Sequence, residues 1–148
     1  MIKNFEQYTC ELNYEELHFI MPRLFKILTL AIGKENAITN KFIVNNINRW
    51  EQITYALPDD KMGVVRTVKT SEPRIRHMIH ILRVSDTLPC LIATSHGYYI
   101  SNDKEEVLSY IQSIDDRLRS IYQVRRAMKR QLKEWVKPNA IQFELNFN

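Results

Sequence analysis

Apolar residues recur at helical spacing near the start of the chain. One helix face is formed by residues at positions i, i+3, i+4 and i+7, namely Leu24, Ile27, Leu28 and Ala31. We expect this helix to begin at Pro22, whose missing amide is harmless at the first helical position, and to end at Gly33, which accepts left-handed backbone. Before it, Asn13 and Glu16 form a capping-box pattern, which predicts a separate short helix over residues 14–20.

A further helix is expected after Thr39 or Asn40, since either side chain can cap its first turn. Its inward positions would be Phe42, Ile43, Ile47 and Trp50. The pattern weakens from residue 52 to residue 70, where the Pro-Asp-Asp run at 58–60 is turn chemistry. Residues 62–68 fit a short helix or a strand equally well, so their structure stays open.

The clearest amphipathic pattern follows Ser71, which is expected to cap a helix with Pro73 in its first turn. The inward stripe consists of Ile75, Met78, Ile79 and Leu82. At about 100° per residue, the opposite face carries Pro73, His77, His80 and Val84, flanked by Arg74, Arg76 and Arg83. A basic, histidine-bearing surface is therefore expected directly opposite a buried stripe.

Two short β-prone runs follow at residues 91–93 and 98–100, after Pro89 breaks the helical pattern. They are joined by Thr94, Ser95, His96 and Gly97, a polar loop that contains a glycine. This arrangement predicts a β-hairpin.

A last, long helix is expected after Asn102 or Asp103, which can cap it. It would run to residue 136, before Pro138, which makes about 33 residues or roughly 50 Å. Apolar residues in it alternate at spacings of four and three, as in a heptad repeat with one charge: Val107, Ile111, Ile114, Leu118, Ile121, Arg125, Met128, Leu132 and Trp135.

This heptad stripe has two interpretations: it pairs two chains into a homodimer, or it packs across its own domain. Arg125 within the stripe favours self-packing for the first half, up to about Ile121. The second half is basic, with Arg117, Arg119, Arg125, Arg126, Lys129, Arg130, Lys133 and Lys137. That half is either a solvated face or a non-specific contact to phosphates, which would make affinity depend steeply on salt.

Composition fits one globular domain, with 148 residues, 45% of them apolar, and a net charge of +4. Only three glycines occur, and no GxxxxGK[ST] or GxGxxG motif is present, which argues against a phosphate-cradling loop. No run approaches the roughly 20 apolar residues of a membrane span, and no signal-peptide core is present. Cys10 and Cys90 form no CxxC motif. We therefore expect a cytoplasmic protein without a membrane partner.

The sequence contains no complete catalytic or metal-binding motif. His77 and His80 share a helix face, but no nearby Asp, Glu or Cys completes a ligand set. The acidic pairs at 59–60 and 115–116 are sequence neighbours, which do not face one another on a helix. We expect no enzyme activity, no metal site and no cofactor.

The order helix, helix, capped helix and hairpin is typical of a winged helix-turn-helix. The predicted fold class is mainly α with a small β-hairpin, followed by a long C-terminal helix. Residues 1–101 would form the winged-helix domain, with 49–69 as an insertion. Residues 102–137 would form the long basic helix, and residues 138–148 a tail.

Such a unit places one helix in a major groove about 12 Å wide and lays its hairpin along the neighbouring backbone. Contacts to double-stranded DNA are therefore expected from Ser71, Arg74, Arg76, His77, His80, Arg83, Thr94, Ser95 and His96. The arginines suit phosphates or guanines, and the histidines suit base edges. The alternative is a protein-interaction adaptor, because winged helices also dock proteins.

Three segments, 33–41, 74–83 and 91–100, resemble a group of small winged-helix proteins encoded by phages, prophages and mobile elements of bacteria. The Ser-x-Gly-Tyr-Tyr hairpin and the helix that follows it are the most specific part, and the resemblance covers residues 33–133. The resemblance implies DNA binding, and the precise role of these proteins is mostly unassigned. We expect this chain to act as a transcription regulator or a DNA replication accessory. The stretch 49–69 departs from that family, whose second and third helices usually follow closely.

The tail resembles the short peptides by which bacterial replication and repair proteins bind the sliding clamp. Gln142 would hydrogen-bond at the rim of an apolar pocket, and Leu145 and Phe147 would fill it. Phe143 departs from the usual Leu. The alternative is a strand that packs on its own domain, since apolar residues alternate from 141 to 147. If the tail docks, the adaptor function would connect the protein to the replication machinery.

Overall fold

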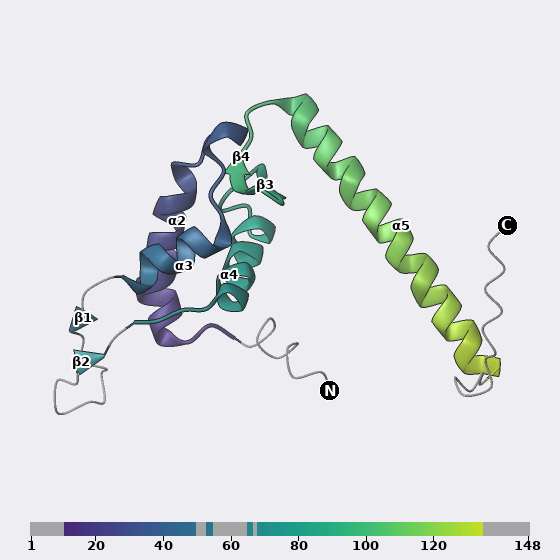
Figure 1. Ribbon diagram of the computed structural model, residues 1–148, viewed down its shortest axis with the longest axis horizontal. Helices are drawn as coiled ribbons and strands as arrows, with labels where there is room; N and C mark the ends of the chain where they lie inside the picture. The colour runs from purple at the N-terminus through teal and green to yellow at the C-terminus, as the bar shows by residue number, and fades with distance from the viewer. Residues whose placement is uncertain (1–10, 50–52, 55–64, 67, 135–148) are drawn as a thin grey trace, which may run out of the picture. The chain divides into compact units, whose positions relative to one another are not determined.

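The computed structural model describes residues 11–49, 53–54, 65–66 and 68–134. The chain divides into two compact units, Met1–Val107 and Leu108–Asn148. As predicted, the described residues are mainly helical, with a small antiparallel hairpin and a long C-terminal helix (Figure 1). Among the helices that the structure describes, none combines the length and apolar character that crossing a bilayer requires.

The first two predicted helices form one continuous helix, which corrects the sequence prediction. A π-helical turn, Glu16–Ile20 (η1), runs directly into α2, Met21–Thr29. Pro22 lies inside this helix, where it cannot donate a hydrogen bond to the carbonyl four residues back. The π-helical turn next to it is a local adjustment of the kind that accommodates such an interruption, so the helix continues instead of restarting.

The predicted capping box is present at the start of this helix. The Asn13 amide donates to Glu16 Oε2 at 3.0 Å, and the Glu16 amide donates to Asn13 Oδ1 at 2.8 Å. At the other end, α2 stops at Thr29, so the predicted end at Gly33 was wrong. Gly33 does adopt a positive φ of 84°, but it precedes a short 3₁₀ turn, Lys34–Asn36 (η2).

The helix α3, Asn40–Asn48, is capped by Thr39, whose Oγ1 accepts a hydrogen bond from the Phe42 amide at 3.2 Å. Ile43 and Ile47 are buried as predicted, but Phe42 is 55% exposed, which corrects its assignment to the core. Adjacent helix positions differ by about 100°, so the face that buries Ile43 turns Phe42 towards solvent.

The expected insertion, 49–69, is described only in part, and Trp50 lies outside the described residues. Two short strands, β1 Ile53–Thr54 and β2 Val65–Arg66, pair antiparallel. The stretch that the sequence left open between helix and strand therefore contains a strand.

The helix α4, Glu72–Val84, begins after Ser71 as predicted, although the Ser71 side chain makes no capping hydrogen bond. Its predicted inward residues are all buried: Ile75, Met78, Ile79 and Leu82. They form one cluster with Ile20, Leu24, Leu28, Ile43, Ile47 and Leu91. α4 thus supplies the centre of the core of the first unit.

The predicted hairpin consists of β3, Leu91–Thr94, and β4, Gly97–Ile100, paired antiparallel. The other edge of β4 is also occupied, because the Ile38 and Tyr98 backbones exchange two hydrogen bonds of 2.9 Å. Gly97 has a φ of 125°, and a Cβ there would lie 2.5 Å from the Ile38 carbonyl carbon. A glycine at this position lets the hairpin turn approach the backbone just before α3.

The long helix α5, Lys104–Glu134, begins after Asp103, whose Oδ1 accepts a hydrogen bond from the Glu105 amide at 2.9 Å. The hydroxyls of Tyr99 and Ser101 both donate to the Glu106 carboxylate, which fixes the first turn of the helix to the hairpin. No residue of α5 is buried. The predicted packing of its first half against the domain stays a prediction.

Candidate nucleic-acid interface

The residues predicted to face DNA come from α4 and from the turn between β3 and β4. Arg76 and His80 are exposed on α4, as is Ser71 just before it. His77 and Arg83 are half-buried on the same helix. Thr94, Ser95 and His96 are exposed at the hairpin turn.

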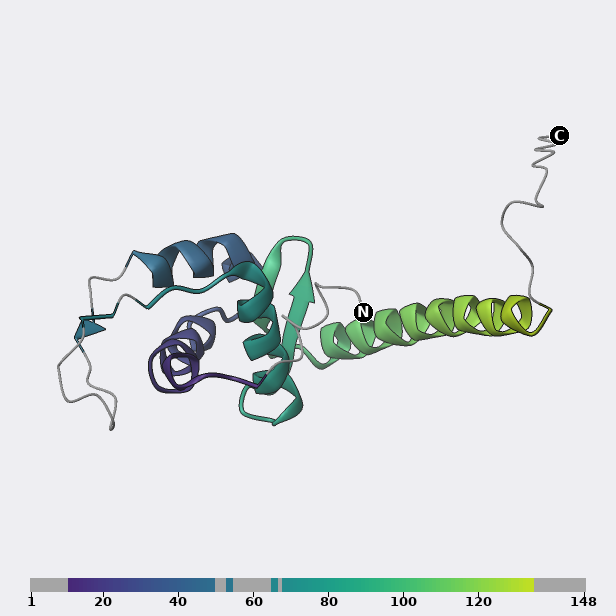
Figure 2. The same ribbon diagram turned by 90° about the horizontal axis from the view of Figure 1, so that it is seen from below.

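The start of α4 and the hairpin turn both lie against the start of α3. Asn40 Nδ2 donates to Glu72 O at 3.2 Å and to Glu72 Oε2 at 3.3 Å, which ties the first residues of the two helices together. Gly97, at the hairpin turn, lies against the backbone of Ile38 and Thr39. In Figure 2 the hairpin turn, α3 and the first turn of α4 accordingly lie on the same side of the unit.

Two helix N-termini therefore lie close together beside a polar turn. The amides of a helix N-terminus carry partial positive charge and favour anions such as phosphate. Sequence reasoning gave Thr39 and Asn40 only a capping function. Nothing in the spacing of the sequence indicated that the same two residues contact both the hairpin and α4, because these contacts join segments 32 or more residues apart.

Arg74 is engaged inside the protein, so its assignment to the DNA surface is corrected. Its Nε and one terminal nitrogen donate to the two Glu16 carboxylate oxygens, each at 2.6 Å. The Arg74 side chain is 17% exposed and that of Glu16 is 7% exposed. The same guanidinium also donates to Glu11 O at 3.2 Å. A bidentate, mostly buried pair of this kind ties α4 to the first helix and leaves Arg74 poorly placed to contact DNA.

The ionisation of Glu16 follows from these contacts. Burial alone would raise the pKa of this carboxyl, but the hydrogen bonds from Arg74 and from the Asn13 amide, together with the positive charge of Arg74, lower it further than burial raises it. The net result is a pKa below the ordinary value of 4.5. Glu16 is thus ionised at neutral pH, as the pairing with Arg74 requires.

Arg76 stands in contrast to Arg74. Its guanidinium donates to Glu72 Oε2 at 2.9 Å, and the two side chains are 45% and 43% exposed. Exposed pairs at this i, i+4 spacing are worth about 0.3–0.5 kcal/mol. A phosphate group can therefore replace Glu72 as the partner of Arg76 at small cost.

The hairpin turn is held in shape by its own side chains. Thr94 Oγ1 donates to Gly97 O at 3.3 Å and accepts a hydrogen bond from the His96 amide at 3.1 Å. Ser95 Oγ lies 3.3 Å from His96 Nδ1. Thr94 therefore shapes the turn, and Ser95 and His96 are its polar groups that face solvent.

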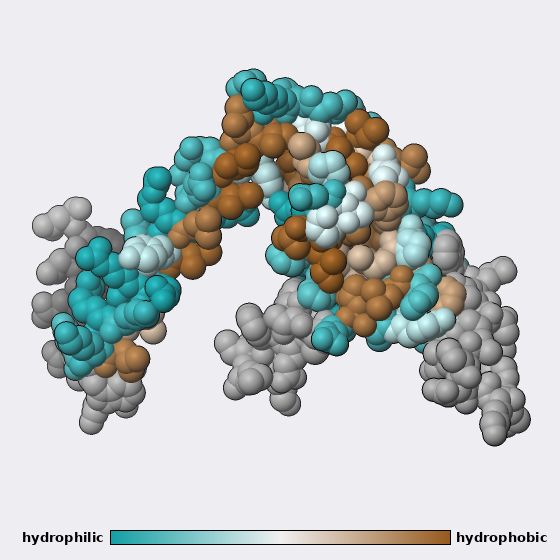
Figure 3. Space-filling model, turned by 180° about the vertical axis from the view of Figure 1, so that it is seen from behind, coloured by the Kyte–Doolittle hydropathy of each residue, from teal (hydrophilic) through white to brown (hydrophobic). Residues whose placement is uncertain are grey.

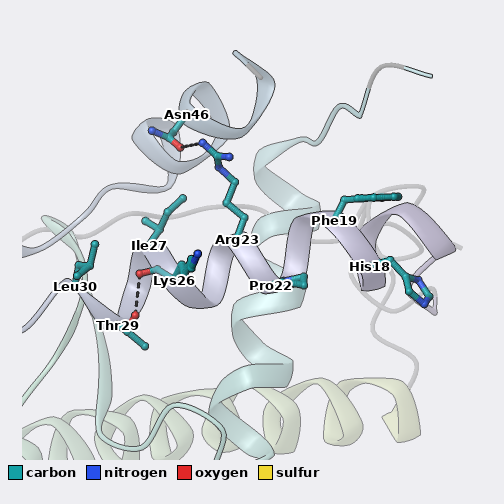
Figure 4. A pocket seen from close by; sticks show the side chains of 9 residues that line it. All are labelled: His18, Phe19, Pro22, Arg23, Lys26, Ile27, Thr29, Leu30 and Asn46. Atoms are coloured by element: carbon teal, nitrogen blue, oxygen red, sulfur yellow. Dashed lines mark hydrogen bonds between the residues drawn. The ribbon is translucent and has the colours of Figure 1, made fainter. Parts of the chain in front are cut away.

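A groove that sequence reasoning missed runs along the first helix on the side of Asn46. Figure 4 shows its lining, which combines apolar side chains such as Phe19, Ile27 and Leu30 with the basic side chains of Arg23 and Lys26. Its volume is about 720 Å³. Arg23 donates to Asn46 Oδ1 at 3.4 Å. The only sign of this groove in the sequence was that the first helix carries apolar residues outside its predicted inward stripe.

Other predicted features carry less information. Within the described ranges, no three His, Cys, Asp or Glu side chains gather as a metal site would require. Cys90 is exposed and forms no disulfide bond within the part of the chain that the structure describes. The clamp-binding residues Gln142, Leu145 and Phe147 lie outside the described residues, so that prediction stays a prediction.

Comparison with known proteins adds no assignment. No family model, no curated protein and no solved structure matches this chain. The interface therefore has to be argued from its own geometry.

Proposed function

We propose that the first unit binds double-stranded DNA as a winged helix-turn-helix, with α4 in the major groove and the β3–β4 turn beside it. The observation that carries this proposal is the pair of contacts made by the start of α3, through Asn40 to Glu72 and through Thr39 to Gly97. These contacts bring a helix N-terminus and a short polar turn to one end of the unit. A winged helix uses such a combination to contact a groove and its flanking phosphates, which supports the proposal.

Within this proposal the residues of α4 and of the hairpin turn have chemical assignments. Arg76 and Arg83 contact phosphates or guanine edges, and His80 contacts a base edge. Ser71 and the positive N-terminal end of α4 contact a phosphate. Ser95 and His96 contact the neighbouring sugar-phosphate backbone. Arg74 is left out because Glu16 already holds it.

The basic half of α5 adds a second source of phosphate contacts. Residues 117–134 carry seven basic side chains and one acidic side chain, so their net charge is +6. Such a segment raises affinity for any duplex without reading its sequence. A transcription regulator and a DNA replication accessory would both use this combination of a specific and a non-specific contact.

The test is fluorescence anisotropy of a labelled random duplex, repeated from low to moderate salt. Replacing Arg76 and Arg83 together by Ala should weaken binding about tenfold or more and reduce the salt slope by about 2. The control is Lys26→Ala combined with Lys34→Ala, which removes the same charge from exposed residues away from α4. We expect the control to bind almost as the wild type does.

Equal losses in both double variants would mean that overall charge, and not α4, determines binding. Absence of binding at low salt would remove the proposal altogether. It would then favour the protein-interaction adaptor as the second candidate function, for which the apolar groove lined by Phe19, Ile27 and Leu30 is the supporting observation.

A further inference from the structure

Most of the apolar stripe of α5 is exposed. Five of its large apolar residues are at least 48% exposed, namely Ile111, Leu118, Ile121, Met128 and Leu132. In Figure 3 brown side chains form a band along α5 beside teal ones. Leaving this much aligned apolar surface in water is unfavourable, at about 25 cal/mol per Å².

The stripe has the spacing and length of a coiled-coil seam. Steps of four and three residues connect Val107 to Leu132, which is 26 residues or almost four heptads. Seams of about three to four heptads are long enough to pair helices. With Ile111, Leu118, Arg125 and Leu132 at the a positions, the d positions hold Val107, Ile114, Ile121 and Met128.

Charge along α5 is strongly asymmetric. Residues 104–116 contain one Lys against two Glu and two Asp, a net charge of −3, whereas residues 117–134 have a net charge of +6. Paired helix axes lie about 8–10 Å apart, comparable to the Debye length of about 8 Å at physiological ionic strength. A parallel pair would therefore align the +6 segments with each other, whereas an antiparallel pair places the acidic segment level with basic residues of the other helix at both ends.

We propose that α5 pairs with α5 of a second copy of this chain in an antiparallel coiled coil. In an antiparallel pair, two residues that lie level on the two helices have residue numbers that always add up to the same value, and this value defines the register. When the two numbers add up to 239, every a residue lies opposite a d residue of the second copy. Leu118 then meets Ile121 of the second copy, Ile111 meets Met128, and Val107 meets Leu132. The whole of α5 takes part in this register.

The same register accounts for the charge within the seam. Arg125 lies level with Ile114 of the second copy and next to its Asp115, which holds the e position beside the seam. An ion pair across the edge of the seam then offsets the cost of placing Arg125 there. In a parallel pair Arg125 would instead face its own counterpart, with no acidic residue within one turn on either helix. The b and f positions keep Arg119, Arg126, Arg130 and Lys133 facing solvent, so pairing and phosphate contacts are compatible.

The first experiment measures the mass of the full chain in solution by sedimentation velocity over a concentration series. We expect a species of twice the 17.7 kDa mass of one chain. Leu118→Asp, at the centre of the seam, should raise the dissociation constant about tenfold or more. The matched control is Gln123→Asp, which introduces the same charge on the far side of the helix and should leave pairing nearly unchanged.

The second experiment measures orientation with spin labels on single cysteines, in a background with both native cysteines replaced by Ser. Labels at Ser109 should lie about 31 Å apart along the helix axis in the antiparallel pair, because 21 residues at 1.5 Å separate the two sites. Labels at Ser120, next to the centre, should lie close together and serve as the control.

Each result decides the proposal. If the chain is a monomer at all concentrations and Leu118→Asp is indistinguishable from the wild type, the coiled-coil proposal is overturned. The result would then favour packing of the α5 stripe within its own chain. A short distance at Ser109 would overturn the antiparallel orientation. Both measurements are made without DNA, so their outcome is independent of the proposed DNA binding.

Discussion

α4 and α5 carry the same kind of amphipathic pattern but meet different surroundings. In α4 the apolar stripe is fully covered, and Ile75 and Met78 are both 0% exposed. In α5 the corresponding stripe is open, and Ile121 is 65% exposed. The periodicity of a helix therefore predicts which face is apolar, but it does not predict what covers that face.

The charged residues of α4 and α5 also differ in what they contact. On α4, two arginines only two positions apart are used differently, since Arg74 is held by a buried carboxylate and Arg76 by an exposed one. On α5, the charges lie in two blocks of opposite sign. The short helix is organised by contacts within its unit, and the long helix by its charge pattern.

The largest expected effect compares matched truncations in the two stripes. Ile75→Ala should lower the free energy of unfolding of the first unit by about 3 kcal/mol, because it leaves a cavity in a packed core. Ile121→Ala should change it by no more than about 0.5 kcal/mol, because that side chain lies in water in the single chain. Hydrogen exchange of the α4 amides, measured on dilute protein, reports the difference. A similar loss in both variants would show that α5 is covered within its own chain.

A smaller effect is expected from the two arginines. Arg74→Ala should destabilise the first unit by about 2 kcal/mol, since it leaves the Glu16 carboxylate buried without its charged partner. Arg76→Ala should cost about 0.5 kcal/mol or less, as expected for an exposed pair. Urea unfolding monitored by circular dichroism measures both. If the two variants lost equal stability, Arg74 and Arg76 would not differ in their contribution to the fold, and the contrast drawn between them would be wrong.

The smallest expected effect is the pH dependence that Glu16 confers. Its pKa is lower in the folded protein than the ordinary value of 4.5, so its contribution to stability is complete above that value. The contribution is lost as the pH falls through the lower, folded-state pKa. Comparing the wild type with Glu16→Gln from pH 7 to pH 3 isolates this contribution, because the variant has no carboxyl to titrate. Parallel pH curves for the two proteins would contradict the assignment.

Local sequence determined most of the secondary structure. The capping box of Asn13 and Glu16, the Thr39 cap, the inward stripe of α4 and the limits of the hairpin all follow from interactions within a few residues, which the sequence displays directly. The mainly helical class follows from the same signals. The continuous helix through Pro22 was missed because the π-helical turn that accommodates the proline has no signature of its own in the sequence.

Only the tertiary structure decided how the predicted surface is used. Charge and periodicity placed Arg74 on the outer face of α4, but its partner Glu16 lies 58 residues away in the chain, and no local pattern connects them. The contacts of Asn40 with Glu72 and of Gly97 with Ile38 are of the same kind. Sequence periodicity reports the local geometry of a single element, whereas these contacts arise from packing between elements, which the folded chain alone specifies.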